Sequence, residues 1–260
     1  MRGEFSRAAA TYDEAAILAR EVGGRMAERL DFVKLAPKRF ADVGCATGDG
    51  VRELQRRYPD ALPLAVDFAP PMLQAVKSRA TLLQRLRGRS PRLVNADVRA
   101  LPLVANSLDL VWSNLVLHWL DDPLLAFKEL HRVLGVGGLL NFAMLGPDTL
   151  KELRAAGATS LRGFPDMHDI GDMLVAAGFA DPVIDMEMIT FAYRSPRRLL
   201  ADQRHLGVRD GLLGQMPWRD WRRVFAAWDG KAGFEIVYGH AWKAEPRVAE
   251  DGRSIVRFAR

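Results

Sequence analysis

A glycine-rich turn between a strand-like run and a helix-like run constrains the fold of this chain more than any other feature. Residues 40–43 form a short, mostly apolar run that includes Asp42. This run is followed by Gly44 and Gly48, and residues 51–57 then have a helical pattern. Because glycine has no Cβ, the chain can turn sharply there and a ligand can lie against the main chain at the carboxyl end of the strand. The turn therefore predicts a ligand site.

The class of ligand follows from the spacing around this turn. Asp67 stands nineteen residues after Gly48 and ends a second predicted strand, where a carboxylate can accept both hydroxyl hydrogens of an adenosine ribose. A nicotinamide dinucleotide site would have a second glycine where Ala46 stands, and a nucleoside triphosphate site would have a lysine directly after Gly48 or Gly50. S-adenosylmethionine is the ligand that fits best.

Strand-like and helix-like segments alternate over about 100 residues around this site. Such alternation implies a doubly wound α/β fold, in which helices cover both faces of a parallel sheet. We predict strands at 40–43, 62–67, 92–95, 108–113 and 138–145, and helices at 51–57, 71–87 and 123–134.

The flanking segments predict helical additions to this sheet. Residues 5–30 have helical spacing, with a break expected at Gly23-Gly24. We expect the apolar residues of a helical insertion at 195–228 to cover the functional edge of the sheet. The remaining predicted elements are helices at 148–156 and 169–177, an extended segment at 183–193 and a final strand at 234–242.

Length and composition predict one domain over residues 1–260, with N-terminal helices at 1–36 and helical cover elements at 146–178 and 195–230. The apolar runs are too short to span a membrane, so we expect no membrane association. The N-terminal region lacks the pattern of a secretory signal, which favours a cytoplasmic location. The single cysteine, Cys45, forms neither an internal disulfide nor a metal site by itself, and no metal is predicted.

The segment Asp42-x-Gly44-x-Ala46-x-Gly48 resembles the first motif of the class I S-adenosylmethionine-dependent methyltransferases. This resemblance implies a mostly parallel, seven-stranded, Rossmann-like sheet with helical lid insertions. Three later segments are similar to the family's ribose-binding turn, its adenine-contacting segment and its fourth strand, whose end approaches the methionine part of the cofactor. They are residues 67–73, 95–98 and 109–115.

The resemblance implies S-adenosylmethionine as the cofactor and assigns it a set of binding residues. Within this set, Asp97 is expected to accept a hydrogen bond from the exocyclic amine of adenine. Cys45 is expected to be a small buried neighbour of the ligand and not a nucleophile, because no histidine is nearby in the sequence. The set comprises Asp42, Gly44, Cys45, Ala46, Gly48, Asp67, Phe68, Met72, Ala96, Asp97, Val98, Ser113 and Asn114.

Residues 5–13 and 113–119 are similar to the malonyl-acyl-carrier-protein O-methyltransferases of biotin synthesis, and the resemblance covers nearly the whole chain. Residues 117–119, 144–154 and 169–174 also resemble a mitochondrial complex I assembly factor associated with arginine hydroxylation. The first resemblance implies methyl transfer to the free carboxylate of malonyl-acyl carrier protein. The alternatives are hydroxylation of a protein arginine, methylation of another small acid, or an assembly role without catalysis.

The first of these reactions needs no general base, because a carboxylate is already anionic at neutral pH. We therefore name no catalytic acid or base. Arg154, in a predicted helix at the carboxyl edge of the sheet, is the leading candidate to hold the acceptor carboxylate, with Tyr12 and His118 as further donors. In the alternative interpretation Arg154 pairs with Asp148 or Glu152 on its own helix, Tyr12 contacts the cofactor and His118 packs in the core.

Two basic segments account for much of the net charge of +5. Residues 77–92 contain six basic residues and no acidic one, and residues 194–223 contain eight arginines against three aspartates. We expect these segments to dock the acidic acyl carrier protein, although they are also compatible with ordinary solvated helix faces. Nucleic acid is not expected as a partner, because no recognition module accompanies the charge.

Overall fold

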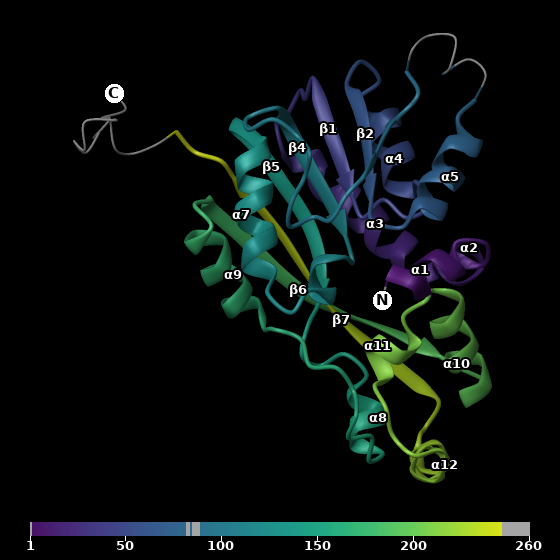
Figure 1. Ribbon diagram of the computed structural model, residues 1–260. Coiled ribbons are helices and arrows are strands. Elements are labelled where there is room, and N and C mark those ends of the chain that lie inside the picture. The colour runs from purple at the N-terminus through teal and green to yellow at the C-terminus, as the bar shows by residue number, and fades with distance from the viewer. Residues whose placement is uncertain (1, 82–83, 85–88, 246–260) are drawn as a thin grey trace.

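The computed structural model describes residues 2–81, 84 and 89–245, and its sheet has the strand order β3-β2-β1-β4-β5-β7-β6 (Figure 1). The first five strands in this order are parallel, and β7 runs antiparallel to both β5 and β6. The doubly wound, mostly parallel seven-stranded sheet is confirmed. The strands are β1 (Arg39–Val43), β2 (Leu62–Asp67), β3 (Arg92–Asn95), β4 (Leu108–Asn114), β5 (Leu134–Leu145), β6 (Ala180–Ala192) and β7 (Lys231–Trp242).

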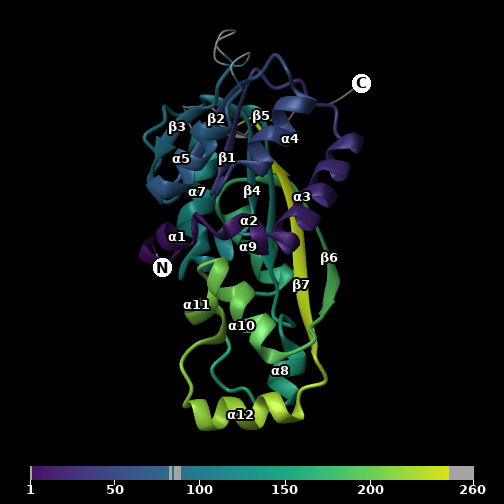
Figure 2. The same cartoon turned by 90° about the vertical axis from the view of Figure 1, so that its right-hand side faces the viewer.

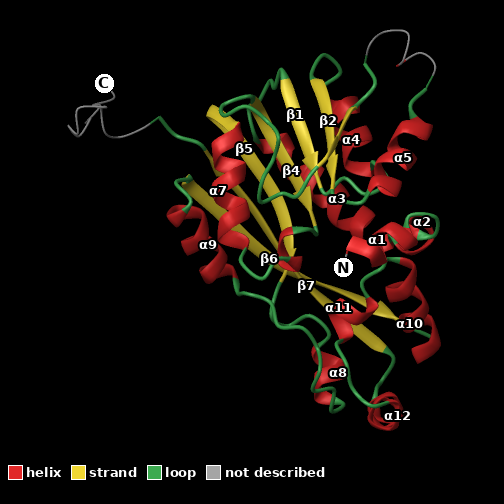
Figure 3. Ribbon diagram, viewed as in Figure 1, coloured by secondary structure: helices red, strands yellow, loops and turns green. Residues whose placement is uncertain are grey.

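Helices cover both faces of the sheet (Figure 3). On one face lie α3 (Ile17–Arg29), α4 (Asp49–Arg57) and α5 (Pro70–Arg79); on the other lie α7 (Pro123–Val133) and α9 (Met167–Ala176). Neighbouring residues of a strand point to opposite faces, so Phe40 packs in the core under α3 and α4, whereas Ala41 packs in the core under α7 and α9. Both cores are continuous across the central strands.

Local sequence explains where the helices α7 and α9 begin. Asp122 caps α7 by accepting a hydrogen bond from the backbone N–H of Leu124, and Pro123 follows at the first helical position. Asp166 caps α9 in the same way, accepting from the N–H groups of His168 and Asp169. These two caps fix the residues at which α7 and α9 begin.

The N-terminal helices differ from the prediction. The predicted break at Gly23-Gly24 is wrong, because α3 runs through both glycines, and the chain instead turns between α1 (Arg2–Ala8), α2 (Tyr12–Ala15) and α3. A Cβ on Gly23 would lie 3.2 Å from Nδ2 of Asn114. This glycine therefore serves close packing of α3 against the end of β4, not a change of chain direction.

The predicted helix at 71–87 is shorter in the structure, where α5 ends at Arg79 and Ala80 is its C-terminal cap. Residues 82–83 and 85–87 of that prediction lie outside the described residues. The other predicted strands and helices are found within a few residues of their expected bounds.

The later helices lie beyond the carboxyl edge of the parallel strands (Figure 2). There α8 (Lys151–Ala155), α10 (Pro196–His205), α11 (Arg209–Leu213) and α12 (Trp218–Ala227) surround the long ends of β6 and β7. By contrast α9, predicted as part of the cover, packs against α7 and β6 on the flank of the sheet. Among the described residues, no helix is long and apolar enough to cross a membrane.

Candidate active site

Two cavities meet where β1 and β4 end. The smaller, of about 270 Å³, lies beside the glycine-rich turn, and the larger, of about 470 Å³, lies between the N-terminal helices and α10. Both are bordered by Phe5, Tyr12, Leu115 and Trp119, which form a shared wall. In an open α/β sheet, ligands bind at the carboxyl ends of the strands where the strand order reverses, and β1 and β4 flank that point here.

The turn after β1 depends on glycine at its first position. Gly44 has φ +78°, and a Cβ there would lie 2.2 Å from Cγ2 of Val116. The N–H groups of Gly44 and Cys45 both donate to the carbonyl of Val66, which anchors the turn to the end of β2. Ala46 has φ +45°, a left-handed conformation that costs a non-glycine residue about 1 kcal/mol. The turn therefore keeps its shape even though an alanine stands where a glycine would be unstrained.

Asp67, at the end of β2, holds this turn with both carboxylate oxygens. Oδ2 accepts a hydrogen bond from the N–H of Ala46 at 3.0 Å, and Oδ1 accepts from the N–H of Ala69 at 2.8 Å. The side chain is buried and lines the smaller cavity, and burial raises its pKa to about 6. Each oxygen keeps a second lone pair, so the carboxylate is still able to accept from two ligand hydroxyls.

Asp42 lies on the other side of the turn, beneath the start of α4. A Cβ on Gly50 would be 2.5 Å from its Oδ2, so the helix approaches the carboxylate closely. Burial and the charge of Asp67 raise the pKa of Asp42 to about 8. Asp42 borders a small cavity of about 40 Å³ and does not border the 270 Å³ cavity. Its side chain therefore supports the turn and does not face the ligand site.

The segment after β3 also lines the smaller cavity. Asp97 is bound by Arg99, whose Nε and Nη2 lie 2.9 and 2.7 Å from the two carboxylate oxygens, and this pairing lowers the pKa of Asp97. Its oxygens are therefore already shared with a cation. Phe68, Met72, Ala96 and Val98 also line this cavity.

The end of β4 places two predicted polar residues in different surroundings. The hydroxyl of Ser113 donates to the carbonyl of Val43 at 3.0 Å, is fully buried, and does not border the smaller cavity. Asn114 borders that cavity, and its Nδ2 donates to the carbonyl of Ala19 at 2.7 Å. Its buried Oδ1 has no partner within the described part of the chain. An acceptor left free in this way suits an ammonium group of a ligand.

These features fit S-adenosylmethionine. The glycine turn leaves the main chain open to the cavity, Asp67 offers free lone pairs for ribose hydroxyls, and Asn114 offers an unused acceptor near the shared wall. Cys45 is buried beside the turn, where burial raises the pKa of its thiol well above the ordinary value, so it stays protonated. No group of three His, Cys, Asp or Glu side chains suited to a metal ion occurs in the described ranges.

The N-terminal helices close over the glycine turn through one polar cluster. The hydroxyl of Thr47 donates to Oδ1 of Asp13 at 2.6 Å, and Arg79 binds the other oxygen of Asp13. The same arginine donates to the carbonyl of Thr47 at 2.8 Å. Sequence reasoning missed this cluster, because its three members come from α2, the turn and α5 and share no motif.

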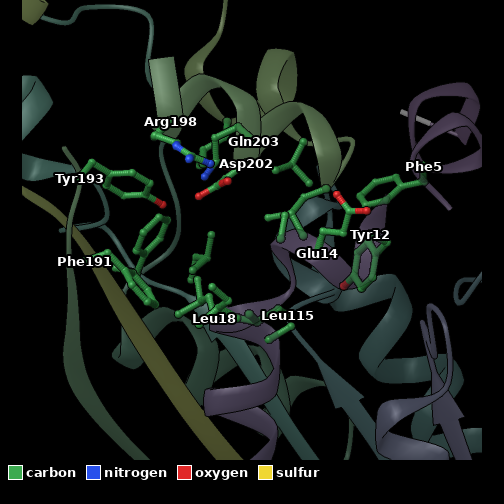
Figure 4. Close-up of a pocket in the computed structure, with 18 of the residues that line it drawn as sticks. Phe5, Tyr12, Glu14, Leu18, Leu115, Phe191, Tyr193, Arg198, Asp202 and Gln203 are labelled. Atoms are coloured by element: carbon green, nitrogen blue, oxygen red, sulfur yellow. The ribbon is translucent and has the colours of Figure 1, made fainter. Parts of the chain in front are cut away.

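The larger cavity has aromatic and apolar walls with polar groups at separate places (Figure 4). Tyr12 borders both cavities, and burial together with the charge of Asp67 raises its pKa, so the phenol keeps its proton. His118 is buried in the wall, and burial lowers its pKa to about 3. Its Nδ1 accepts a hydrogen bond from the N–H of Leu145 at 3.3 Å, which leaves Nε2 to carry the proton.

Arg154 lies away from this cavity. It is exposed on α8, and its guanidinium donates to the carbonyl of Pro147 at 3.1 Å, so it does not border the larger cavity. Arg194 and Arg198 border it instead. The surplus of arginine in residues 194–223 was the only signal for them in the sequence, and it did not distinguish these two from the other six.

Comparison with known proteins is consistent with this geometry. A family model described as a methyltransferase domain matches residues 41–142. The malonyl-[acyl-carrier protein] O-methyltransferase of Gallionella capsiferriformans is 50% identical, with 99% of this chain and 94% of that protein covered. The protein of the same name from Laribacter hongkongensis is 48% identical, with the same coverage of 99% and 94%.

Among solved structures, the YcgJ protein of Bacillus subtilis has a TM-score of 0.60 at 16% identity, with 87% of this chain and 99% of that chain covered. At this level of identity the likeness concerns the fold. It extends beyond the matched residues 41–142 to most of the sheet and its helices.

Proposed function

This chain belongs to the family of malonyl-[acyl-carrier protein] O-methyltransferases, and from that premise we propose the reaction it catalyses. It transfers the methyl group of S-adenosylmethionine to the free carboxylate of malonyl-acyl carrier protein, in biotin synthesis. The proposed location is the cytoplasm. The observation that carries the proposal is that the two cavities adjoin and share four lining residues. A methyl donor bound in one cavity and an acceptor bound in the other would meet at these residues.

The residues that would hold the cofactor are those that border the smaller cavity. Asp67 would accept from the ribose hydroxyls, the segment around Asp97 would contact adenine, and Asn114 would accept from the amino group of the methionine part. S-adenosylmethionine supplies an electrophilic methyl group on a sulfonium. Asp42, Cys45, Gly48 and Ser113 support the turn or the strand end, so their contribution to binding is proposed to be indirect.

Tyr12 and His118 are proposed to orient the acceptor carboxylate. Both are neutral donors, because the phenol keeps its proton and the imidazole is uncharged at neutral pH. A neutral donor aligns one carboxylate oxygen without neutralising the charge on the attacking oxygen, as a close cation would do. Alignment of the reacting atoms and exclusion of water supply most of the rate enhancement in such a transfer, and no proton has to be moved.

The aromatic side chains of the shared wall are proposed to exclude water from the reacting atoms. Phe5 packs edge-on against Trp119 with ring centroids 6.3 Å apart, and Trp119 packs against His118 at 4.7 Å. Phe5 also contacts Phe68 at 5.7 Å, which connects α1 to the cofactor side.

The carrier protein is proposed to dock on the basic segment 194–223. This segment includes α10, which borders the larger cavity, so a carrier bound there could deliver its acyl group directly. Arginines in both basic segments pair with aspartates: Arg79 with Asp13 and Arg89 with Asp60 in one, and Arg209 with Asp210 in the other. Residues 85 and 87 of the segment 77–92 lie outside the described residues. Such charge attraction would accelerate the association of the carrier protein with the enzyme, and the effect would weaken with added salt.

The direct test uses purified protein, labelled S-adenosylmethionine and malonyl-acyl carrier protein. Mass spectrometry should detect the methyl ester of the malonyl group, and acetyl-acyl carrier protein, which has no free carboxylate, should give no product. Expression in a bacterium lacking its biotin methyltransferase should restore growth without biotin. If calorimetry detects cofactor binding but neither ester nor growth appears, the proposal is wrong, and arginine hydroxylation or an assembly role becomes the alternative.

A further inference from the structure

Two arginines, Arg194 and Arg198, border the larger cavity. Arg194 follows β6 and Arg198 lies in the first turn of α10, and both are exposed while bordering the cavity. Figure 4 shows Arg198 across the cavity from Phe5 and Tyr12, with its guanidinium directed inward. The cavity therefore has a cationic end and an end next to the cofactor.

Within the described residues, the guanidinium groups of Arg194 and Arg198 make no hydrogen bond and no ion pair. By contrast Arg162, near the same cavity, donates to the carbonyl of Trp119 and pairs with Asp121 at 3.3 Å. Asp202 also lies at the cationic end, but the two arginines leave a local surplus of positive charge there. An unpaired cationic surface at a cavity mouth attracts anions.

The acceptor carboxylate cannot be the group that these arginines hold. The attacking oxygen has to reach the transferred methyl, so the carboxylate lies at the shared wall, beside Tyr12. Arg198 lies at the opposite end. An anion held at the cationic end would therefore be a second anionic group of the same substrate.

The volume of the cavity indicates which group this is. Cavities of about 300–1,000 Å³ enclose drug-sized ligands, and this one measures about 470 Å³, much more than a malonyl group needs. The remaining space suits the flexible arm that carries the acyl group as a thioester. That arm is joined to its carrier protein through a phosphodiester, an anion that follows the acyl end along the chain of the substrate.

We propose that Arg194 and Arg198 bind the phosphodiester of the carrier's thioester-bearing arm. This inference rests on the proposed function. Guanidinium groups bind phosphate oxygens through paired, charge-assisted hydrogen bonds, so two of them hold such a group firmly at the mouth. The arm then lies along the cavity, and its acyl end reaches the shared wall.

The experiment compares three malonyl thioesters: malonyl-acyl carrier protein, malonyl-phosphopantetheine, which has the phosphate but no protein, and malonyl-pantetheine, which has neither. Arg198→Ala should lower kcat/KM at least about tenfold for the first two and leave the third unchanged. Arg194→Ala should show the same pattern to a smaller or equal extent. Arg197→Ala is the matched control, because it removes the same charge from the adjacent position of α10 and does not border the cavity.

Each other outcome contradicts the proposal. An equal loss with malonyl-pantetheine means that Arg198 holds the acceptor carboxylate, and a loss with the carrier protein alone means that it contacts the protein surface. A loss no larger than that of Arg197→Ala means general charge attraction. Thermal melting checks that the variants fold, and absence of methyl transfer by the unmodified protein to all three substrates would instead overturn the proposed function.

Discussion

The carboxylate of Asp67 accepts a hydrogen bond from the backbone N–H of Ala46 across 3.0 Å. The residue that ends β2 thus holds the turn that follows β1, and Ala46 keeps its left-handed backbone conformation within that contact. The same carboxylate faces the smaller cavity. One side chain therefore both shapes the cofactor site and is available to bind in it.

Asp67→Ala should weaken S-adenosylmethionine binding by about 2 kcal/mol or more, because charge-assisted hydrogen bonds are lost and the turn loses its anchor. Calorimetry measures the affinity, and circular dichroism should show that the variant is folded. Asp97→Ala is the comparison: its carboxylate is shared with Arg99 and adenine also has apolar contacts, so its effect should be smaller. Unchanged affinity in folded Asp67→Ala would refute the placement of the ribose.

Cofactor affinity should depend on pH through Asp67. Burial raises its pKa to about 6, and only the ionised carboxylate accepts from both hydroxyls. Affinity should therefore be constant above about pH 7 and fall toward tenfold per pH unit below about pH 6. Calorimetry between pH 5 and 8 tests this, and Asp67→Asn should show a flatter curve. An identical slope in Asp67→Asn would assign the pH dependence to another group.

Asp42 should make the folded protein less stable as pH rises. Its folded-state pKa is raised to about 8, so the folded state holds a proton that the unfolded state releases near pH 4. The stability from this protonation is present below about pH 4 and is lost as pH rises to about 8. In urea denaturation, Asp42→Asn should gain stability relative to the unmodified protein between pH 5 and 8. A constant difference across that range would contradict the shift.

His118 should act without titrating near neutrality. Because burial lowers its pKa to about 3, the rate should show no inflection from this residue between about pH 6 and 8. His118→Phe should lower kcat/KM at least about tenfold with little change in cofactor affinity, and His118→Gln, which keeps a donor, should lose less. The exposed His168 on α9 provides the control, His168→Gln, with unmodified kinetics expected. Equal losses in both His118 variants would indicate a packing role.

Gly44→Ala should destabilise the fold by about 2 kcal/mol or more and impair cofactor binding. The new Cβ would lie 2.2 Å from Val116, at φ +78°. Gly24→Ala is the matched control, because nothing lies within 4 Å of the position in α3, and it should stabilise by about 0.5–1 kcal/mol. Chemical denaturation measures both changes. A Gly44→Ala variant as stable as the unmodified protein would mean that the turn adopts another conformation.

Local patterns predicted most of the sheet. Residues 62–67 and 92–95 were expected as strands and are β2 and β3 with the same bounds. Short apolar runs ended by turn residues specify strands without distant contacts, and glycine together with a spaced carboxylate specifies the nucleotide-type turn. The helix break predicted at Gly23-Gly24 was wrong because a glycine in a helix can serve close packing as well as a break. Which of these roles applies depends on the contact of Gly23 with Asn114, a residue far along the chain.

Local sequence patterns therefore specify the fold, the turn after β1 and the class of cofactor, because the residues responsible are close together in the chain and have periodic or fixed spacing. The set of side chains around the acceptor depends instead on how distant segments pack in three dimensions. This packing leaves Arg154 on the exposed side of α8 and brings Arg198 from α10 and Tyr12 from α2 to opposite ends of one cavity. Such proximity arises when apolar surfaces pack and bury distant segments against each other, and it leaves no local pattern in the sequence.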